Sequence, residues 1–401
     1  MIRRFDFPLL HDHHSHVSLY SALHGLPDLL GLDRRAAQAL LASQPPDRLG
    51  IVTGWRTDAH PLPESELARL PPLIIVNSSL HGFALTPEAL PFVRELWPDF
   101  YENSRDAAWG EKNLPQLFSF YARVAGLDST KLAAFMDGLE AIGIGSAEDM
   151  TLTGPKALAT ILDSPYAERI RVWAAPSVYR GLGASERGAC VGAKIFLDGS
   201  LGARSAALDR PFLSGEKGPL IYSDGELGSL LAEIASWKTG ISIHAIGHRA
   251  IEQGLAALES LRADGIVFEA PRFEHVQFVD RAQARRFRDI GAVLSVQPNF
   301  NADSIDYADR LAPRHLEEND PFRMLIDEIG FVPGRDLIFG SDGMPHGPLE
   351  AFRCGLFPPF PSQRLTETEL VAGYGAALGG LGRTLTLAVD DEKKIITPAR
   401  D

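Results

Sequence analysis

Short runs of apolar and β-branched residues alternate along the chain with longer segments of helical periodicity. Each apolar run ends in polar or glycine-rich sequence, and near-continuous apolar strands of this kind are typical of parallel sheets covered on both faces. Eight runs predict strands in this way: 8–10, 143–146, 170–175, 193–197, 241–246, 273–277, 292–297 and 337–340.

The segments between these runs have the spacing of amphipathic helices. They are residues 154–162, 227–236, 249–262, 281–290 and 320–329. In 249–262, apolar residues recur every three or four positions, which places them on one face of a helix. Eight strands alternating with helices predict a (β/α)8 TIM barrel of the α/β class.

A large insertion, residues 17–140, follows the first predicted strand. It contains strand candidates at 50–54 and 73–76 and helix candidates at 114–124 and 130–139. We expect it to form a cap at the barrel mouth, where the βα loops of this fold lie. Residues 384–401 form a short C-terminal tail with one strand candidate, so 1–401 is predicted to be a single barrel domain.

Composition narrows the function classes. The formal charge of −13 argues against a nucleic-acid or anionic-membrane partner, since phosphate binding needs clustered Lys and Arg. Two cysteines exclude a disulfide framework and a cysteine-based zinc site. No apolar run approaches the ~20 residues of a membrane span, and polar residues interrupt the N-terminus where a signal core would lie. We therefore expect a cytoplasmic protein that acts on a small molecule.

Four of the twelve histidines fall within residues 11–16, in the pattern Asp12-x-His14-x-His16. Residues two apart in a strand face the same side, so His14 and His16 can point at one metal ion. Neutral imidazole is a common ligand of zinc and other transition metals. The pattern alone is weak, because paired histidines also occur in exposed loops.

Three further candidate ligands follow other predicted strands, namely His244, His275 and Asp342. Each lies where an apolar strand gives way to a loop. In a barrel these strand ends converge on one face, where catalytic residues from different strands meet. A lone histidine on a strand is usually a hydrogen-bonded core residue, but their joint placement favours a metal centre.

Lys194 lies inside an apolar strand, between Ala193 and Ile195. A buried ammonium is costly, so the side chain should be deprotonated or paired. One interpretation is a salt bridge, for example to Asp198. The other is reaction of the neutral amine with carbon dioxide to form a carbamate that bridges two metal ions. Spacing alone does not choose between them.

Taken together, these residues resemble those of the amidohydrolase superfamily, specifically the amidohydrolase family 3 (YtcJ-like) branch that includes N-substituted formamide deformylases. The resemblance rests on motifs that occur in the family's order over residues 12–345: Asp12-x-His14-x-His16, Lys194-Ile-Phe-Leu-Asp-Gly-Ser-Leu-Gly-Ala-Arg204, His244-Ala-Ile-Gly-His-Arg-Ala250, Glu274-His275-Val-Gln277, Val296-Gln297-Pro298 and Gly340-Ser-Asp342. Within the insertion, Gly54-Trp55 and Asn77-Ser-Ser-Leu-His81 are similar to the branch's cap segment.

The resemblance implies a centre of two divalent metal ions, zinc in the first place, with manganese or iron as alternatives. It assigns His14, His16 and Asp342 to the more buried ion. His244 and His275 would hold the other ion, and an N-carboxylated Lys194 would bridge the two.

The resemblance also implies hydrolysis of an amide or formamide-like C–N bond by a metal-bound hydroxide, with Asp342 as the proton shuttle. His81 and Arg204 would orient the substrate or stabilise the developing oxyanion.

Three features depart from the family pattern. His248 stands where the family usually has Asp. The β-sandwich that relatives build from both chain ends is expected to be absent or vestigial, which would expose the barrel flank and favour a homodimer there. His11 and His13 lie on the opposite strand face from the ligands and are expected to be structural or solvent-facing.

Other functions remain open at this stage. A lactonase or phosphotriesterase shares the bridging lysine. A ring deaminase usually has Glu where this chain has Gly247, three residues after His244, and generally lacks the lysine. A barrel that binds metal without catalysis is the non-enzymatic alternative. Nucleotide binding has little support, because the glycine pairs at 181–183 and 380–382 lack the third glycine of the phosphate-binding motif.

Overall fold

The computed structural model describes residues 2–57, 59–78 and 80–398. Its centre is an eight-stranded parallel sheet in the order β12-β11-β10-β9-β8-β7-β6-β2. The strands are β2 (Leu10–Ser15), β6 (Ile144–Asp149), β7 (Ile170–Ala174), β8 (Cys190–Phe196), β9 (Gly240–Ala245), β10 (Arg272–His275), β11 (Val293–Val296) and β12 (Leu337–Phe339). Each predicted strand has its counterpart here, which confirms the (β/α)8 barrel.

The first strand continues from the apolar run at 8–10 into the histidine cluster, as expected for His14 and His16 on one strand face. β2 includes the cluster through Ser15. Pro8 instead ends a separate strand, β1 (Ile2–Pro8). Polar residues continue the strand because the interior of the barrel provides hydrogen-bond partners for them, as described below.

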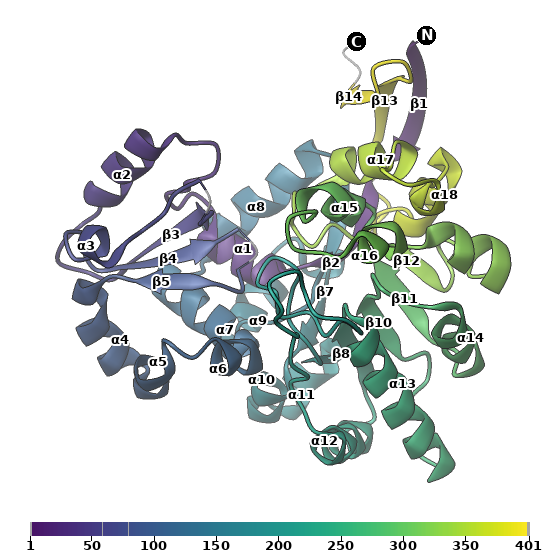
Figure 1. Ribbon diagram of the computed structural model, residues 1–401, viewed down its shortest axis with the longest axis horizontal. Helices are drawn as coiled ribbons and strands as arrows, with labels where there is room; N and C mark the ends of the chain where they lie inside the picture. Colours follow the sequence, from purple (N-terminus) through teal and green to yellow (C-terminus); the bar gives the residue numbers. More distant parts are fainter. Residues whose placement is uncertain (1, 58, 79, 399–401) are drawn as a thin grey trace.

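Helices cover the outside of the barrel (Figure 1). They include α9 (Pro155–Leu162), α10 (Pro176–Gly181), α11 (Ala184–Gly188), α12 (Asp224–Ser236), α13 (His248–Ala263), α14 (Arg281–Asp289), α15 (Asp303–Asp306), α16 (Pro313–Glu318), α17 (Pro348–Leu356) and α18 (Glu367–Tyr374). The helix predicted at 320–329 forms a π-helical turn over Met324–Ile329. Apolar side chains of α9, α10, α12, α13, α14, α17 and α18 share one large core with the strands. Leu316 of α16 packs instead against a separate small cluster that contains Phe278 and Leu311.

The barrel closes between β12 and β2 through the residues that follow β12. The backbone N–H of Asp342 donates to the carbonyl of His14 at 2.7 Å, and that of Ser341 donates to Asp12 Oδ1 at 2.9 Å. A Cβ on Gly340 would lie 2.3 Å from the His14 nitrogen, so only glycine permits this approach. The closure brings Asp342 beside the β2 histidines.

The insertion after β2 builds a layer at one side of the barrel, on the left in Figure 1. Its strands β3 (Gly50–Trp55), β4 (Leu73–Asn77) and β5 (Phe83–Leu85) form a small mixed sheet with its own apolar core. Its helices are α1 (Val17–Leu23), α2 (Arg34–Ala42), α3 (Glu64–Leu67), α4 (Leu90–Leu96), α5 (Pro98–Asn103), α6 (Ala107–Lys112), α7 (Leu114–Ala125) and α8 (Ser129–Ala141). Side chains of α7 and α8 belong to the main core, so the insertion is joined firmly to the barrel.

Both chain ends meet in a third sheet, at the top of Figure 1. β13 (Thr384–Asp390) pairs antiparallel with β1 along its whole length and with β14 (Ile395–Pro398). The buried side chains Phe7 and Val389 of this sheet belong to the barrel core. A three-stranded sheet therefore stands where the family's β-sandwich was expected to be absent or vestigial.

Candidate metal centre

The C-terminal ends of the barrel strands bring the predicted ligands together. His14 and His16 come from the end of β2, and their Nε2 atoms lie 3.5 Å and 3.2 Å from Asp342 Oδ1. Ligand atoms of His14, His275 and Asp342 all lie within 4.8 Å of one another. The His244 ring centroid is 4.5 Å from that of His275. One compact group of side chains thus collects from four strand ends.

Two members of this group have a left-handed backbone. His275 has φ 70° and Asp342 has φ 56°. Non-glycine residues rarely adopt this conformation, which costs of order 1–3 kcal/mol per residue. The conformation turns each side chain out of its strand direction and into the barrel mouth. Such strain is typical of residues that are held for function rather than for stability.

Three of the four histidine rings are fixed through one nitrogen, which leaves the other available, whereas His16 Nδ1 has no hydrogen-bond partner among the described residues. His14 Nδ1 lies 2.6 Å from Glu274 Oε2, and His275 Nδ1 lies 2.8 Å from Gln297 Oε1. His244 instead uses Nε2, 3.1 Å from the carbonyl of Gly199. Metal-binding histidines almost always have such a partner, since it sets the tautomer and the ring orientation.

The protonation states suit metal binding. Burial lowers the pKa of His14 to about 4 and that of His275 well below its ordinary value, so both rings are neutral. Burial would raise the pKa of Asp342, but His14 and His16 lower it to about 2, which keeps the carboxylate ionised. Neutral imidazole and ionised carboxylate are the forms that bind metal ions.

Lys194 is fully buried, and its Nζ has no hydrogen-bond partner in the part of the chain that the structure describes. The salt bridge to Asp198 that the sequence allowed does not form. Asp198 instead accepts three backbone N–H groups at 2.8 to 3.0 Å. Burial lowers the pKa of Lys194 to about 8, so a larger share of its amine is neutral near neutral pH than in an exposed lysine. An unpartnered buried amine beside histidines and a carboxylate fits a two-metal centre with a bridging carbamate.

A buried network of charged groups supports the ligands from below. Arg272 lies 2.6 Å from Glu274 and 2.7 Å from Glu148, so Glu274 connects Arg272 to His14. Burial would raise the pKa of Glu274, but Arg272 and Lys194 hold it far below its ordinary value. Glu274 is therefore ionised and can polarise the His14 ring.

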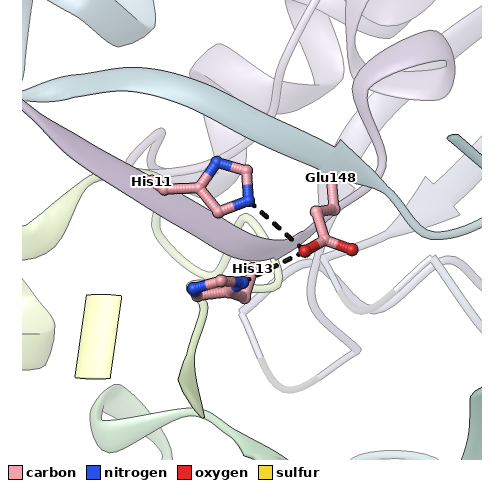
Figure 2. Close-up of side chains that lie close together, drawn as sticks. All are labelled: His11, His13 and Glu148. Atoms are coloured by element: carbon pink, nitrogen blue, oxygen red, sulfur yellow. Dashed lines mark hydrogen bonds and ion pairs between the residues drawn. The ribbon is translucent and has the colours of Figure 1, made fainter. Parts of the chain in front are cut away.

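His11 and His13 end in this network (Figure 2). Glu148 Oε1 lies 3.3 Å from His11 Nε2 and 3.0 Å from His13 Nδ1, and its Oε2 accepts from Trp173 Nε1 at 2.6 Å. The solvent-facing alternative for these histidines is wrong, because the His11 and His13 side chains are only 4 % and 18 % exposed. The geometry of the trio could hold a cation, but Arg272 already neutralises Glu148. The trio is structural.

The cap places His81 at the cavity, whereas Arg204, in the loop after β8, lies away from it. His81 lines the cavity above the ligands, and its ring centroid is 6.4 Å from that of His244. Glu111 on α6 lies 2.9 Å from His81 Nδ1 and accepts from Ser205 Oγ at 2.5 Å. Burial would lower the pKa of His81, but Glu111 raises it on balance. Arg204 is exposed and does not line the cavity, so the structure does not bring it to the site.

The rest of the cavity wall is largely apolar. Its aromatic and aliphatic members include Tyr20, Leu80, Phe118, Phe196, Phe300 and Tyr307. Neither Lys nor Arg is among the lining residues within the described ranges. Asp303 also lines the wall, accepts from Gln277 at 2.9 Å, and has a pKa that burial raises to about 7. The cavity therefore offers an apolar surface, neutral donors and carboxyl groups.

Several residues that support the candidate site were not predicted from the sequence. Glu274 could have been found, since it directly precedes a predicted ligand in a short strand. Glu148, Arg272 and Glu111 had no signal, because the pairs that define their roles, Arg272 with Glu148 and Glu111 with His81, are 124 and 30 residues apart along the chain. Only the folded barrel shows which of the 52 acidic residues are buried beside histidines.

Comparison with solved structures shows the class of this fold. A crystal structure of an uncharacterized metal-dependent hydrolase from Pyrococcus furiosus superposes with a TM-score of 0.66 at 19% identity, covering 92% of this chain and 81% of that chain. A metal-dependent hydrolase from Pyrococcus horikoshii OT3 also gives 0.66, at 21% identity, with 92% and 80% covered. The barrel is thus of the metal-dependent hydrolase type.

Sequence comparisons identify the family. The family model described as "Amidohydrolase family" (Amidohydro_3) matches residues 130–353, more than half of the chain. The chain therefore belongs to amidohydrolase family 3, as its motifs indicated.

Two curated relatives match shorter segments. "Putative amidohydrolase YtcJ" of Bacillus subtilis (strain 168) is 29% identical over 138 residues, 34% of this chain and 26% of that protein. "Protein LONG AFTER FAR-RED 3" of Arabidopsis thaliana is 30% identical over 195 residues, 44% and 32% respectively. The matched segments span a third or less of the length of these relatives.

No helix within the described ranges combines the length and the apolar character needed to cross a membrane.

Proposed function

We propose that this protein is a metal-dependent hydrolase that cleaves a C–N bond, of amide or formamide type, in a small molecule. The observation that carries the proposal is the group formed by Asp342, the histidines of three strand ends, and a buried lysine with no hydrogen-bond partner among the described residues. Family membership supports the same reaction class.

The ligand set suits two divalent ions, zinc first and manganese or iron as alternatives. His14, His16 and Asp342 would hold one ion, His244 and His275 the other, with Lys194 as a carbamate between them. When bound, such ions act as Lewis acids, which makes water nucleophilic near neutral pH and polarises a carbonyl.

The chain's own groups supply the proton movements. Asp342 is ionised and open to the cavity, so its Oδ atoms can take a proton from the attacking water and deliver it to the leaving nitrogen. His81, whose pKa Glu111 raises, can donate to the oxygen that gains charge during attack. The strained backbone of Asp342 keeps its carboxylate aimed at the cavity.

The cavity favours a neutral substrate with an apolar or aromatic substituent. A substrate carboxylate would find no Lys or Arg among the described lining residues, and it would face Asp303 and Asp342. Aromatic side chains such as Phe118 and Phe300 can bury an apolar group. N-formyl and N-acyl derivatives of apolar amines are therefore the substrates of choice.

The test is turnover by the purified protein loaded with zinc or manganese. We expect hydrolysis of N-formyl or N-acyl amines and its loss, by at least a hundredfold, in Asp342→Asn. Asp289→Asn, at an exposed helix end, is the matched control and should keep full activity. The screen includes lactones, phosphotriesters and aminated rings. If the protein hydrolyses one of these three substrate classes and no N-formyl or N-acyl amine, that activity replaces the C–N proposal. Normal metal content without turnover of any substrate would identify a binding scaffold.

A further inference from the structure

A second group of histidines and carboxylates lies outside the metal centre. Asp209 belongs to the long loop after β8, His248 is the first residue of α13, and His315 and Glu318 belong to α16. None of these four lines the substrate cavity. The group joins three segments that are separated by 39 or more residues along the chain, so folding alone brings them together.

Distances within the group are those of a ligand set. Potential ligand atoms of Asp209, His248 and His315 all lie within 4.8 Å of one another. Asp209 Oδ1 is 2.8 Å from His315 Nε2 and 3.6 Å from His248 Nδ1. Two ligands of one tetrahedral zinc ion, each bonded at about 2.0–2.1 Å, are roughly 3.3 Å apart. Small side-chain shifts would therefore accommodate an ion.

Hydrogen bonds inside the protein do not account for the whole group. His248 Nδ1 and Glu318 Oε2 are both buried, yet neither has a hydrogen-bond partner in the described part of the chain. A buried polar atom without a partner costs about 1–3 kcal/mol, so such atoms are uncommon in native proteins. His315 is fully buried, which makes it a fixed rather than an adaptable member.

The surroundings favour a neutral imidazole and a rigid site. His248 stacks on Phe278 with ring centroids 5.6 Å apart. His315 packs against the same phenylalanine in a T-shaped, edge-to-face arrangement with ring centroids 5.7 Å apart. Burial lowers the pKa of His248, which keeps the ring in the form that binds metal. Two ring contacts to one buried phenylalanine hold both histidines in place.

The charges of the group are compatible with a cation. Asp209 and Glu318 contribute two carboxylates, and Arg314 is the nearby guanidinium. Arg314 Nε donates to Glu318 Oε1 at 2.6 Å, and its Nη1 is 3.8 Å from Asp209 Oδ2. Arg314 therefore contacts Glu318 Oε1 and Asp209 Oδ2. The other two oxygens, Glu318 Oε2 and Asp209 Oδ1, face His248. One guanidinium against two carboxylates leaves net negative charge for a divalent ion.

We propose that Asp209, His248 and His315 bind one divalent transition-metal ion of the zinc class, with Glu318 beside the other ring nitrogen of His248. Two imidazoles and carboxylate oxygens are a common zinc environment. This ion would fasten the loop after β8 to α13 and α16. The same loop contributes Ser200, Leu201 and Gly202 to the cavity wall, so the site stabilises the wall without entering the reaction.

The experiment measures metal binding separately from catalysis. The full chain carrying His14→Asn and His16→Asn, which weakens the barrel-mouth centre, is titrated with Co²⁺ and followed by visible absorption and by metal analysis after dialysis. Two further variants remove the second site: His248→Phe, which preserves stacking on Phe278, and His315→Gln. His24→Phe, at an exposed position, is the matched control.

We expect the background protein to retain one Co²⁺ with the strong absorption of a tetrahedral site. His248→Phe and His315→Gln should each lose this ion, and His24→Phe should retain it. Equal Co²⁺ binding in all four proteins, or none in a folded background, would overturn the proposal. If the background protein does not fold, the same single variants are made in the native sequence. The zinc content must then fall by one ion per chain in both site variants and stay unchanged in His24→Phe, and an unchanged content in the site variants overturns the proposal.

Discussion

At the scale of single residues, the surroundings of each ionisable group decide its chemistry. Lys194 has the ordinary side chain of a surface lysine, yet full burial lowers its pKa to about 8. Glu274 is equally buried, but Arg272 holds its pKa far in the acid direction. Burial alone disfavours charge, and a neighbouring opposite charge restores it. This contrast separates Lys194, whose amine burial makes easier to deprotonate, from Glu274, whose charge Arg272 maintains.

Lys194→Ala tests the carbamate at the residue scale. We expect loss of bound metal and of activity, because the bridging oxygens disappear. Short carboxylates such as acetate or formate should restore part of both by occupying the vacated space. Metal analysis and turnover with and without added carboxylate make the measurement. Normal metal content in the variant would rule out the bridging role.

Glu148→Gln tests the network below the ligands. Burial would raise the pKa of Glu148, but Arg272 and the two histidines hold it well below 4.5. The native carboxylate therefore contributes stability that is present above the unfolded-state value and lost as pH falls. Removing it leaves Arg272 buried without this partner, which should cost about 3–5 kcal/mol at pH 7.

Urea unfolding of Glu148→Gln is compared with the native protein between pH 7 and pH 4. The difference in unfolding free energy should narrow below about pH 4.5, where the unfolded carboxylate becomes protonated. Glu233→Gln, which breaks an exposed ion pair with Arg180, is the control and should leave the midpoint unchanged. A pH-independent difference would mean that Glu148 acts through packing alone.

At the scale of elements, one carboxylate of the cap contacts both the site and the barrel rim. Glu111 on α6 contacts His81 from the segment after β4 and Ser205 from the loop after β8. A single side chain thus links two cap segments to the rim of the barrel. The orientation of His81 over the ligands depends on how α6 docks, so the cap takes part in the site as well as covering it.

Glu111→Gln tests this link. The neutral amide cannot raise the pKa of His81, so protonated His81 should become scarce at a lower pH than in the native protein. We expect kcat/KM to fall about tenfold to a hundredfold, as is typical when a supporting hydrogen bond is lost, and the basic limb of the pH profile to move to lower pH. Steady-state kinetics across pH make the measurement. Glu102→Gln, exposed in the same cap, should change neither, and an unshifted profile in Glu111→Gln would remove His81 from the reaction.

At the scale of the whole molecule, the two chain ends are part of the barrel core. Phe7 of β1 stacks on Phe352 of α17 with ring centroids 5.4 Å apart, and β13 covers β1 along its whole length. The terminal sheet is therefore attached to the base of the fold through aromatic packing. A homodimer on this flank stays a prediction, which sedimentation velocity can measure.

Phe7→Ala tests whether the terminal sheet stabilises the barrel. Truncation of a fully buried phenylalanine should cost about 3–5 kcal/mol, since it removes apolar contacts and leaves a cavity. Thermal and urea unfolding of the whole chain make the measurement. Ile2→Ala lies on the same strand but is 65 % exposed, so it should have little effect. Equal stability of both variants would show that the sheet unfolds independently of the barrel.

Much of the fold could be predicted because it depends on local patterns. Short apolar runs such as 241–246 and 292–297 form strands because of their own composition. The alternation of such strands with helices permits few chain topologies. Polar residues continue the first strand in β2, and their long-range partners make that favourable. The candidate ligands His244 and His275 could be recognised from the local sequence, since each lies at the C-terminal end of a predicted apolar strand.

The sequence by itself determined the barrel, the family and the set of ligand candidates, because periodicity and residue type are properties of short segments. Tertiary structure alone decided which nitrogen of His14, His244 and His275 is held, that Lys194 has no hydrogen-bond partner among the described residues, and that Glu111 reaches His81. It also decided that His11 and His13 are buried on Glu148, and that His248 meets His315 and Asp209. Each of these depends on contacts between residues far apart in the chain, and burial at those contacts sets both charge and hydrogen bonding.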